Sequence, residues 1–329
     1  MTAAARLLDR WLLALVLAFA AAGVLWSGPP RGIVGHDGVN LALIVLVAAV
    51  GLGLPTTALL RAREELGRVL TAVVAGAVVL PLFAWLASRL VPAGQLRLGV
   101  LAAGVAPSEV AAVALAALAG GQASVSAAIL VGATLVSIAT AGPVLHLLAG
   151  SAGTFSSTGL LLSLVQIVAI PLVLGALVRA RLPQRLATLA DATSAVASSS
   201  AVLVLIWLVA GQARLSASYL RAGVALLLFL VASTALGALV SYRLSRTRAV
   251  SVLLPVAMRD FAIAAGIATA AFGPAAAAAL GIYGVLVLLL GAATVRFLPR
   301  VSPEPALPTR ALKRARCCGR GKPPRRAGR

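Results

Sequence analysis

Long apolar runs alternate with short arginine-bearing connections along almost the whole chain. Each run can cross about 30 Å of hydrocarbon as a helix, because a helix rises about 1.5 Å per residue. The ten runs fall near residues 11–27, 39–60, 67–91, 97–119, 123–149, 157–179, 192–212, 219–242, 248–271 and 275–298. They lack the period-two alternation of barrel strands and are filled with Leu, Ala, Val and Gly. The pattern predicts an all-α integral membrane protein with ten transmembrane helices.

The composition supports this class. Of 329 residues, 61% are hydrophobic and the mean hydropathy is +1.06, which the surface of a water-soluble domain of this length could not accommodate. The first run follows Arg6 and Arg10 and could be a signal peptide. Residues 26–30, however, form a poor small-residue cleavage site, so we expect a retained helix.

The net charge of +20 is a topology signal rather than a mark of nucleic-acid binding. Arginines concentrate at alternate connections: Arg6, Arg10, Arg61, Arg63, Arg68, Arg179, Arg181, Arg185, Arg243, Arg246, Arg248, Arg296 and Arg300. The opposite connections carry only Arg31, Arg89, Arg97, Arg214 and Arg221. The positive-inside rule therefore predicts a multi-pass protein of the cell (plasma or inner) membrane with both termini in the cytoplasm.

A basic, proline-rich tail follows the last run. We expect residues 301–329 to be disordered, and to serve either as a solvated topology anchor or as a contact for anionic lipid; the anchor is the preferred interpretation. The two cysteines of the chain, Cys317 and Cys318, lie side by side in this tail. They therefore cannot crosslink the membrane core.

Proline and charge interrupt two of the runs. Pro107 is followed by Ser108 and Glu109, and Pro255 is followed closely by Met258, Arg259 and Asp260. A charged side chain facing lipid at mid-depth would cost about 2.5 to 3.5 kcal/mol, so these groups must face protein or water. A broken helix likewise persists in a bilayer only where its unpaired backbone groups face protein or water. We expect helix breaks at both prolines and a functional site beside them.

The interrupted runs are the fourth of each set of five. An odd number of helices per half makes the second half enter the membrane from the opposite side, which is the inverted repeat of many secondary transporters. The sequence predicts repeats at 1–150 and 151–300, followed by the tail at 301–329, with the fourth and ninth helices crossing near the midplane.

These segments resemble the bile acid:sodium symporter family of the wider bile/arsenite/riboflavin transporter group. The resemblance rests on the interrupted fourth helix with the small-residue turn after it (106–126), the interrupted ninth helix (256–272), and the second and third helices around 51–55 and 80–85. It covers about residues 10–298. It implies a ten-helix transporter of organic anions coupled to sodium.

The chain departs from the family pattern at the sodium sites. Ala112 and Val113 stand where sodium-coupled members have a Ser-Asn pair, and Gly76 stands where they have a glutamine. Pro255 replaces a glutamate, and Arg259 and Asp260 replace Gln-Asn. A guanidinium in the same pocket opposes a cation. We therefore expect a divergent member whose sodium-site residues are replaced.

The charged residues suggest a mechanism. Arg259 offers a fork of donors to an oxyanion, with Ser108 and Met258 beside it, and the N-termini of the half-helices add positive charge. Glu109 and Asp260 could counter Arg259 and take up protons. Alternatively, Arg259 forms a structural ion pair with one of the two acids. Residues with polar side chains that could line a cavity are Ser126, Thr134, Gln166 and Ser199.

We expect a secondary active transporter that moves an organic anion by alternating access, coupled to protons or sodium. Its partners are a small organic anion and the lipid bilayer. The sequence has no nucleotide loop, metal-ligand cluster or serine-histidine motif, so we expect no enzyme, no metal and no cofactor beyond H⁺ or Na⁺. An anion channel and a metalloid efflux transporter remain alternatives. The arsenite branch of the group has a cysteine where this chain has Ser108, which weakens the second.

Overall fold

The structure is a computed structural model that describes residues 3–34, 38–54, 65–150, 155–214 and 216–297. The basic tail, with Cys317 and Cys318, lies outside these residues. Within them the regular elements are helices, apart from one isolated antiparallel bridge between Ser108 and Arg259. The prediction of an all-α membrane protein is confirmed.

The helices follow the apolar runs along the chain. In order they are α1 (Ala3–Leu25), α2 (Gly28–Val34), α3 (Gly38–Gly53), α5 (Leu66–Ser88), α6 (Gln95–Val105), α7 (Ala111–Leu118), α8 (Ala123–Ala149), α9 (Ser157–Leu164), the π-helical η3 (Val165–Ala169), α10 (Ile170–Arg181), the 3₁₀ turn η4 (Gln184–Leu186), α11 (Ala187–Ala210), α12 (Ala217–Ser241), α13 (Arg246–Ala257), α14 (Phe261–Phe272), α15 (Pro274–Ala277) and α16 (Leu280–Phe297). The runs at 97–119 and 248–271 are each divided into two helices.

Six helical segments of the described chain are long and apolar enough to cross a membrane. They are Leu66–Ser88, Ala123–Ala149, Ser157–Arg181, Ala187–Ala210, Ala217–Ser241 and Pro274–Arg296. Four further apolar helices have 10–17 residues: Ala14–Leu25, Gly38–Gly53, Gln95–Val105 and Phe261–Phe272. Two of these four, α6 and α14, are halves of the interrupted runs, which explains their shortness.

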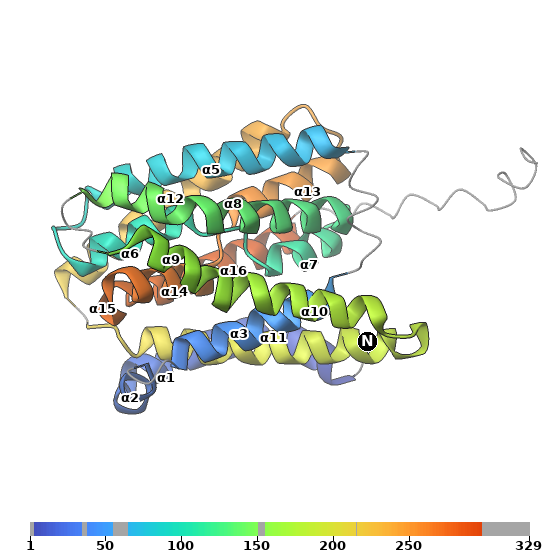
Figure 1. Cartoon of the computed structure of the whole chain (residues 1–329), viewed down its shortest axis with the longest axis horizontal. Helices are drawn as coiled ribbons and strands as arrows, with labels where there is room; N and C mark the ends of the chain where they lie inside the picture. The colour runs from blue at the N-terminus through green and yellow to red at the C-terminus, as the bar shows by residue number, and fades with distance from the viewer. Residues whose placement is uncertain (1–2, 35–37, 55–64, 151–154, 215, 298–329) are drawn as a thin grey trace, which may run out of the picture.

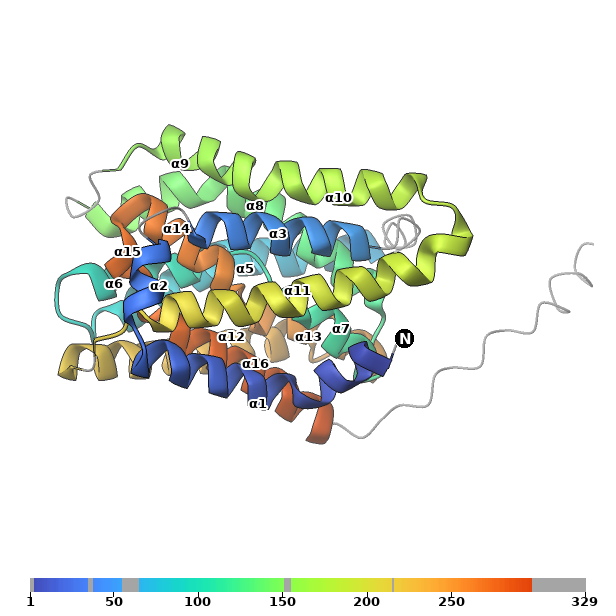
Figure 2. The same cartoon turned by 90° about the horizontal axis from the view of Figure 1, so that it is seen from below.

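The helices form two groups (Figure 1). In the first, which we call the four-helix layer, α10, α3, α11 and α1 lie side by side in that order (Figure 2). Gly51 on α3 and Gly175 on α10 allow the closest contact in this layer, because a Cβ at either position would meet the main chain of the other helix. The second group, the crossing body, contains α5 to α8 and α12 to α16.

The crossing body surrounds the two interruptions. The helices α5 and α12 pack together, α6 packs against α5 and α14, and α13 packs against α12 and α8. Its largest fully buried side chains include Tyr283 and Phe229, whose rings lie 5.8 Å apart between centroids. Both interruptions are therefore enclosed by protein.

Candidate functional site

Two extended segments meet where the interrupted helices stop. Residues 106–110 link α6 to α7, and residues 258–260 link α13 to α14; we call this meeting point the crossing. The N–H of Glu109 donates to the Met258 carbonyl at 2.9 Å, and the N–H of Asp260 donates to the Pro107 carbonyl at 2.9 Å. The segments thus satisfy each other's backbone groups, as the interior of a bilayer requires.

The first interruption lies where the sequence predicts it. Ala106 has φ −63° and ψ 151° and ends α6, because the ring of Pro107 disfavours helical geometry in the residue before it. The second does not coincide with Pro255. That proline lies inside α13, which continues to Ala257, and the chain becomes extended only at Met258. The predicted break is therefore displaced by three residues.

Serine hydroxyls donate hydrogen bonds to the main-chain carbonyls that lack a helical partner at these irregularities. Ser137 donates to the last carbonyl of α6, at Val105, over 2.6 Å, and Ser233 donates to the last carbonyl of α13, at Ala257, over 2.7 Å. Ser126 donates to the Ser251 carbonyl at 2.9 Å. Residue 251 precedes Pro255 by four positions, so its carbonyl is the one that proline leaves without a helical partner. Ser126, predicted to line a cavity, instead satisfies the backbone.

The charged residues of the crossing are buried. The relative exposure is 3% for Glu109, 4% for Arg259 and 0% for Asp260. Ser108 and Met258 are buried as well, and Met258 packs toward Gly291 of α16. The structure thus brings together the five side chains predicted for substrate and ion, but they do not share one face.

Arg259 points away from both acids. Successive side chains of an extended segment alternate in direction, so Arg259 and Asp260 face opposite sides. A Cβ added to Gly76 of α5 would lie 2.7 Å from Nη2 of Arg259, which places the guanidinium directly against that glycine. Across the described chain, Arg259 forms no ion pair. The alternative of a structural ion pair with Glu109 or Asp260 is wrong for this arrangement.

The guanidinium faces a small cavity instead. A space of about 20 Å³ lies between α5, α6 and α8, and its walls include Arg259, Pro81, Ser137 and Thr140. That volume is enough for about one water molecule. No described residue accepts a hydrogen bond from the Arg259 side chain, and its Nε is buried without a partner.

Glu109 and Asp260 occupy the other side of the crossing. Oδ1 of Asp260 accepts the N–H of Ile263 at 2.8 Å and so caps α14. The carboxyl of Glu109 faces the main-chain N–H groups of Ala111 and Phe261, the first residues of α7 and α14, and the two acids interact electrostatically. The positive ends of these half-helices, expected to face the substrate, therefore face the protein's own acids.

Tyr283 is a site residue that the sequence analysis did not single out. Its side chain comes from α16, is fully buried, and interacts electrostatically with Arg259, Glu109 and Asp260. Its hydroxyl lies near the main-chain N–H of Arg259 but, like Oε2 of Glu109 and Oδ2 of Asp260, makes no well-aligned hydrogen bond in the described structure. A hydroxyl in the middle of an apolar run is the sequence signal that would have found it.

The remaining residues predicted to line a cavity do not contact the guanidinium cavity of Arg259. Thr134 donates to the Leu130 carbonyl at 2.8 Å and lines a second cavity of about 20 Å³, between α3, α8 and α14. Gln166 lies in η3 and is exposed, and Ser199 on α11 is half-buried. No group of three or more His, Cys, Asp or Glu residues that could hold a metal occurs in the described ranges.

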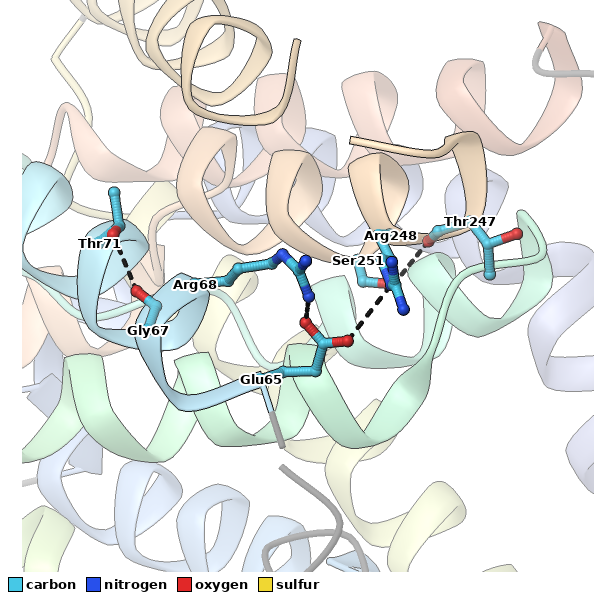
Figure 3. Close-up of polar contacts among 7 residues, drawn as sticks. All are labelled: Glu65, Gly67, Arg68, Thr71, Thr247, Arg248 and Ser251. Atoms are coloured by element: carbon cyan, nitrogen blue, oxygen red, sulfur yellow. Dashed lines mark hydrogen bonds and ion pairs between the residues drawn. The ribbon is translucent and has the colours of Figure 1, made fainter. Parts of the chain in front are cut away.

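A separate charge cluster joins α5 to α13 at the end where both helices begin (Figure 3). Glu65 pairs with Arg68 on α5, and its Oε1 lies 3.2 Å from Nε of Arg248 on α13. The two arginine side chains are 39% and 44% exposed, so solvent screens these contacts. The cluster holds two helices of the crossing body together but is not part of the crossing.

A comparison with known protein families gives a match over the middle of the chain. Residues 40–222 match the family model described as the sodium bile acid symporter family, which is more than half of the chain. The chain belongs to the sodium bile acid symporter family. No curated protein sequence matches the chain. Members of the sodium bile acid symporter family are membrane transporters rather than enzymes, so the expectation of a multi-pass transporter is confirmed at that level.

Proposed function

We propose that this protein is a secondary active transporter that moves an organic anion across the cell membrane by alternating access. The proposal includes ten membrane-crossing segments in two inverted repeats, residues 1–150 and 151–300, with both termini in the cytoplasm. The antiparallel pairing of the two interrupted helices through Ser108 and Arg259 supports it, because inverted repeats bring equivalent helices together in opposite directions.

One observation carries the proposal. Arg259 is a buried guanidinium at the crossing with no protein acceptor among the described residues, and it faces a water-sized cavity. A buried charge that nothing pairs is expensive, and stability alone gives no reason to keep it. A carboxylate or sulfonate that reaches the guanidinium would supply the missing acceptors in a bidentate geometry. We assign Arg259 to the anion, with Ser108 beside it.

The coupling ion is proposed from the acids. Glu109 and Asp260 are close, buried and each left with an unpartnered oxygen, so a proton or a sodium ion between them would relieve their repulsion. The family description favours sodium. The replacement of the expected sodium ligands and the presence of a guanidinium at the crossing favour protons. We propose proton coupling, with Arg259 serving the anion and the two acids serving the proton.

Ligand-dependent thermal stabilisation of the purified protein tests the proposal. A library of organic anions that includes the bile salt taurocholate is measured with and without sodium and at two pH values. A transported anion should raise the melting temperature, because it binds the folded state alone. Stabilisation that depends on pH and not on sodium supports proton coupling, and the reverse result assigns the acids to sodium.

Uptake into proteoliposomes completes the test. The Arg259→Ala variant should insert and fold but lose anion transport. Full transport by this variant contradicts the role of Arg259, and a flux that does not saturate with anion concentration favours a channel.

A further inference from the structure

A large cavity lies at the end of the bundle where α5 ends and α6 begins. Its volume is about 650 Å³, within the range of small-molecule sites. Three segments far apart in the sequence form its walls: the connection between α5 and α6 with the start of α6, the connection between α11 and α12 with the start of α12, and the short helix α15 with Ala278 after it. We call this cavity the vestibule. Its polar side chains are those of Gln95, Gln212, Arg214, Ser216, Ser218 and Tyr219.

The walls of the vestibule combine an apolar surface with positive charge. Val91, Pro92 and Leu96 supply apolar contacts, and Arg214 supplies an exposed guanidinium. The helices α6 and α12 both begin here, and no side chain caps α6 at Gly94. Each helix start adds partial positive charge to that of Arg214.

The excess of arginine at this end of the molecule also favours the binding of anions. The connections at this end carry Arg31, Arg89, Arg97, Arg214 and Arg221. The one acid among these connections is Asp37, which lies outside the described residues. A concave surface with one sign of charge raises the local concentration of the opposite sign, which here means anions.

The vestibule and the crossing lie at opposite ends of the same two half-helices. The helix α6 runs from Gln95 at the vestibule to Val105 at the crossing, and its 11 residues span about 16 Å. The helix α14 starts at the crossing and ends beside Pro274, which also lines the vestibule. The hydroxyl of Tyr219 donates to the Ala278 carbonyl at 3.4 Å and ties α12 to the start of α16 at the vestibule wall. The vestibule is therefore a preformed space built mainly on helix ends.

We propose that the vestibule is a second, peripheral binding site, which takes the carboxylate or sulfonate head of an organic anion on Arg214 and its apolar body on the surrounding walls. Its part in transport rests on the proposed function, whereas its preference for anions does not. By the charge distribution it opens on the extracytoplasmic side. An anion would be held there, about 16 Å from the crossing along α6, before it reaches Arg259.

A labelling experiment tests the site without requiring transport. In full-length protein with Cys317 and Cys318 replaced by serine, Ser218→Cys places one thiol on the vestibule wall. Intact cells are treated with membrane-impermeant methanethiosulfonates, one anionic and one cationic, and the ratio of their rates is measured. Because both reagents attack the same thiolate, the ratio cancels differences in thiol ionisation. We expect the anionic reagent to be favoured, and taurocholate to slow the labelling.

The matched variants are Arg214→Gln and Arg221→Gln, since Arg221 lies near Arg214 in the sequence, on α12, but does not line the vestibule. Loss of the Arg214 charge should lower the anionic-to-cationic ratio by about three- to fivefold, and loss of the Arg221 charge should change it much less. A thiol at 218 that reacts with neither reagent, or a ratio unchanged by Arg214→Gln, overturns the proposal.

Taurocholate protection is then measured in the Arg259→Ala background. If protection persists there while transport is lost, the vestibule and the crossing are separate sites, as proposed. Protection that disappears with Arg259 overturns the separate site and leaves the proposed function intact. An anion-selective vestibule in a protein that transports no anion overturns the proposed function alone.

Discussion

Gly76→Ala is the sharpest test of the position of the Arg259 guanidinium. The added Cβ would lie 2.7 Å from Nη2 and 3.5 Å from Cζ of Arg259. Ordinary contact between such atoms requires about 3.5 to 4.0 Å, so the guanidinium must withdraw by about 1 Å. The guanidinium is the far end of a flexible side chain, so the shift is cheap for the fold. The same shift should weaken anion binding strongly, because the guanidinium must meet the oxyanion in a fixed geometry.

The melting temperature and the uptake efficiency of Gly76→Ala should therefore respond differently. Replacing glycine by alanine inside a helix contributes about 0.5 to 1 kcal/mol of stability, so the melting temperature should stay the same or rise. A displacement of about 1 Å at a reacting or binding centre can cost about 100-fold, so we expect the uptake efficiency kcat/KM to fall by about ten- to 100-fold. Uptake of the best stabilising anion into proteoliposomes measures it.

Gly67→Ala is the matched control for this substitution. Gly67 lies on the same helix, and a Cβ there meets nothing within 4 Å. That variant should transport normally. If Gly76→Ala is folded and transports as well as Gly67→Ala, the guanidinium does not act from the position that the structure gives it.

Three further predictions address the acids, the tyrosine and the charge cluster. Asp260→Asn retains a side-chain oxygen for the cap of α14 and should flatten the pH dependence of uptake. Asp260→Ala should do the same and also lower the free energy of unfolding by about 0.5 to 2 kcal/mol, because the cap is lost. If the pH dependence of uptake is unchanged in Asp260→Asn, Asp260 does not couple transport to protons. Tyr283→Phe removes a buried hydroxyl without a described partner, so thermal melting should show equal or higher stability while uptake falls; unchanged uptake would make Tyr283 a packing residue. Glu65→Gln should cost about 0 to 1 kcal/mol of unfolding free energy, less in high salt, because its arginine partners are part-exposed; a larger, salt-independent loss contradicts the screening argument.

The features that local chemistry determines could be predicted from the sequence. Apolar length gave the helices, and Pro107 gave the end of α6, because a proline acts on the residue directly before it. The burial of Glu109, Arg259 and Asp260 followed from the cost of charge in lipid. Each of these inferences needs only neighbouring residues and the bilayer.

The features that depend on distant segments could not be predicted from the sequence. Arg259 and Asp260 face opposite sides because the chain is extended at that point, and the sequence placed the break at Pro255 instead. Tyr283 reaches the crossing from α16, and the vestibule is formed by three segments separated by tens of residues. Such features depend on how helices pack, which hydropathy and spacing do not determine.

The continuity of α13 through Pro255 can be tested by a double-mutant cycle. Ser126→Ala should leave the Ser251 carbonyl unpaired and lower the free energy of unfolding in mixed micelles by about 1 to 3 kcal/mol. In a Pro255→Ala background the new N–H at 255 can donate to that carbonyl, since the two residues are one helical turn apart. Ser126→Ala should then cost about 1 kcal/mol less.

Ser137→Ala serves as the control for this cycle, because its hydroxyl donates to Val105 on α6 and has no connection with residue 255. Its effect should add to that of Pro255→Ala within about 0.5 kcal/mol. If Ser126→Ala is equally additive, its hydroxyl does not replace the missing helical donor. The persistence of α13 beyond Pro255 would then have to come from its packing against α12 and α8.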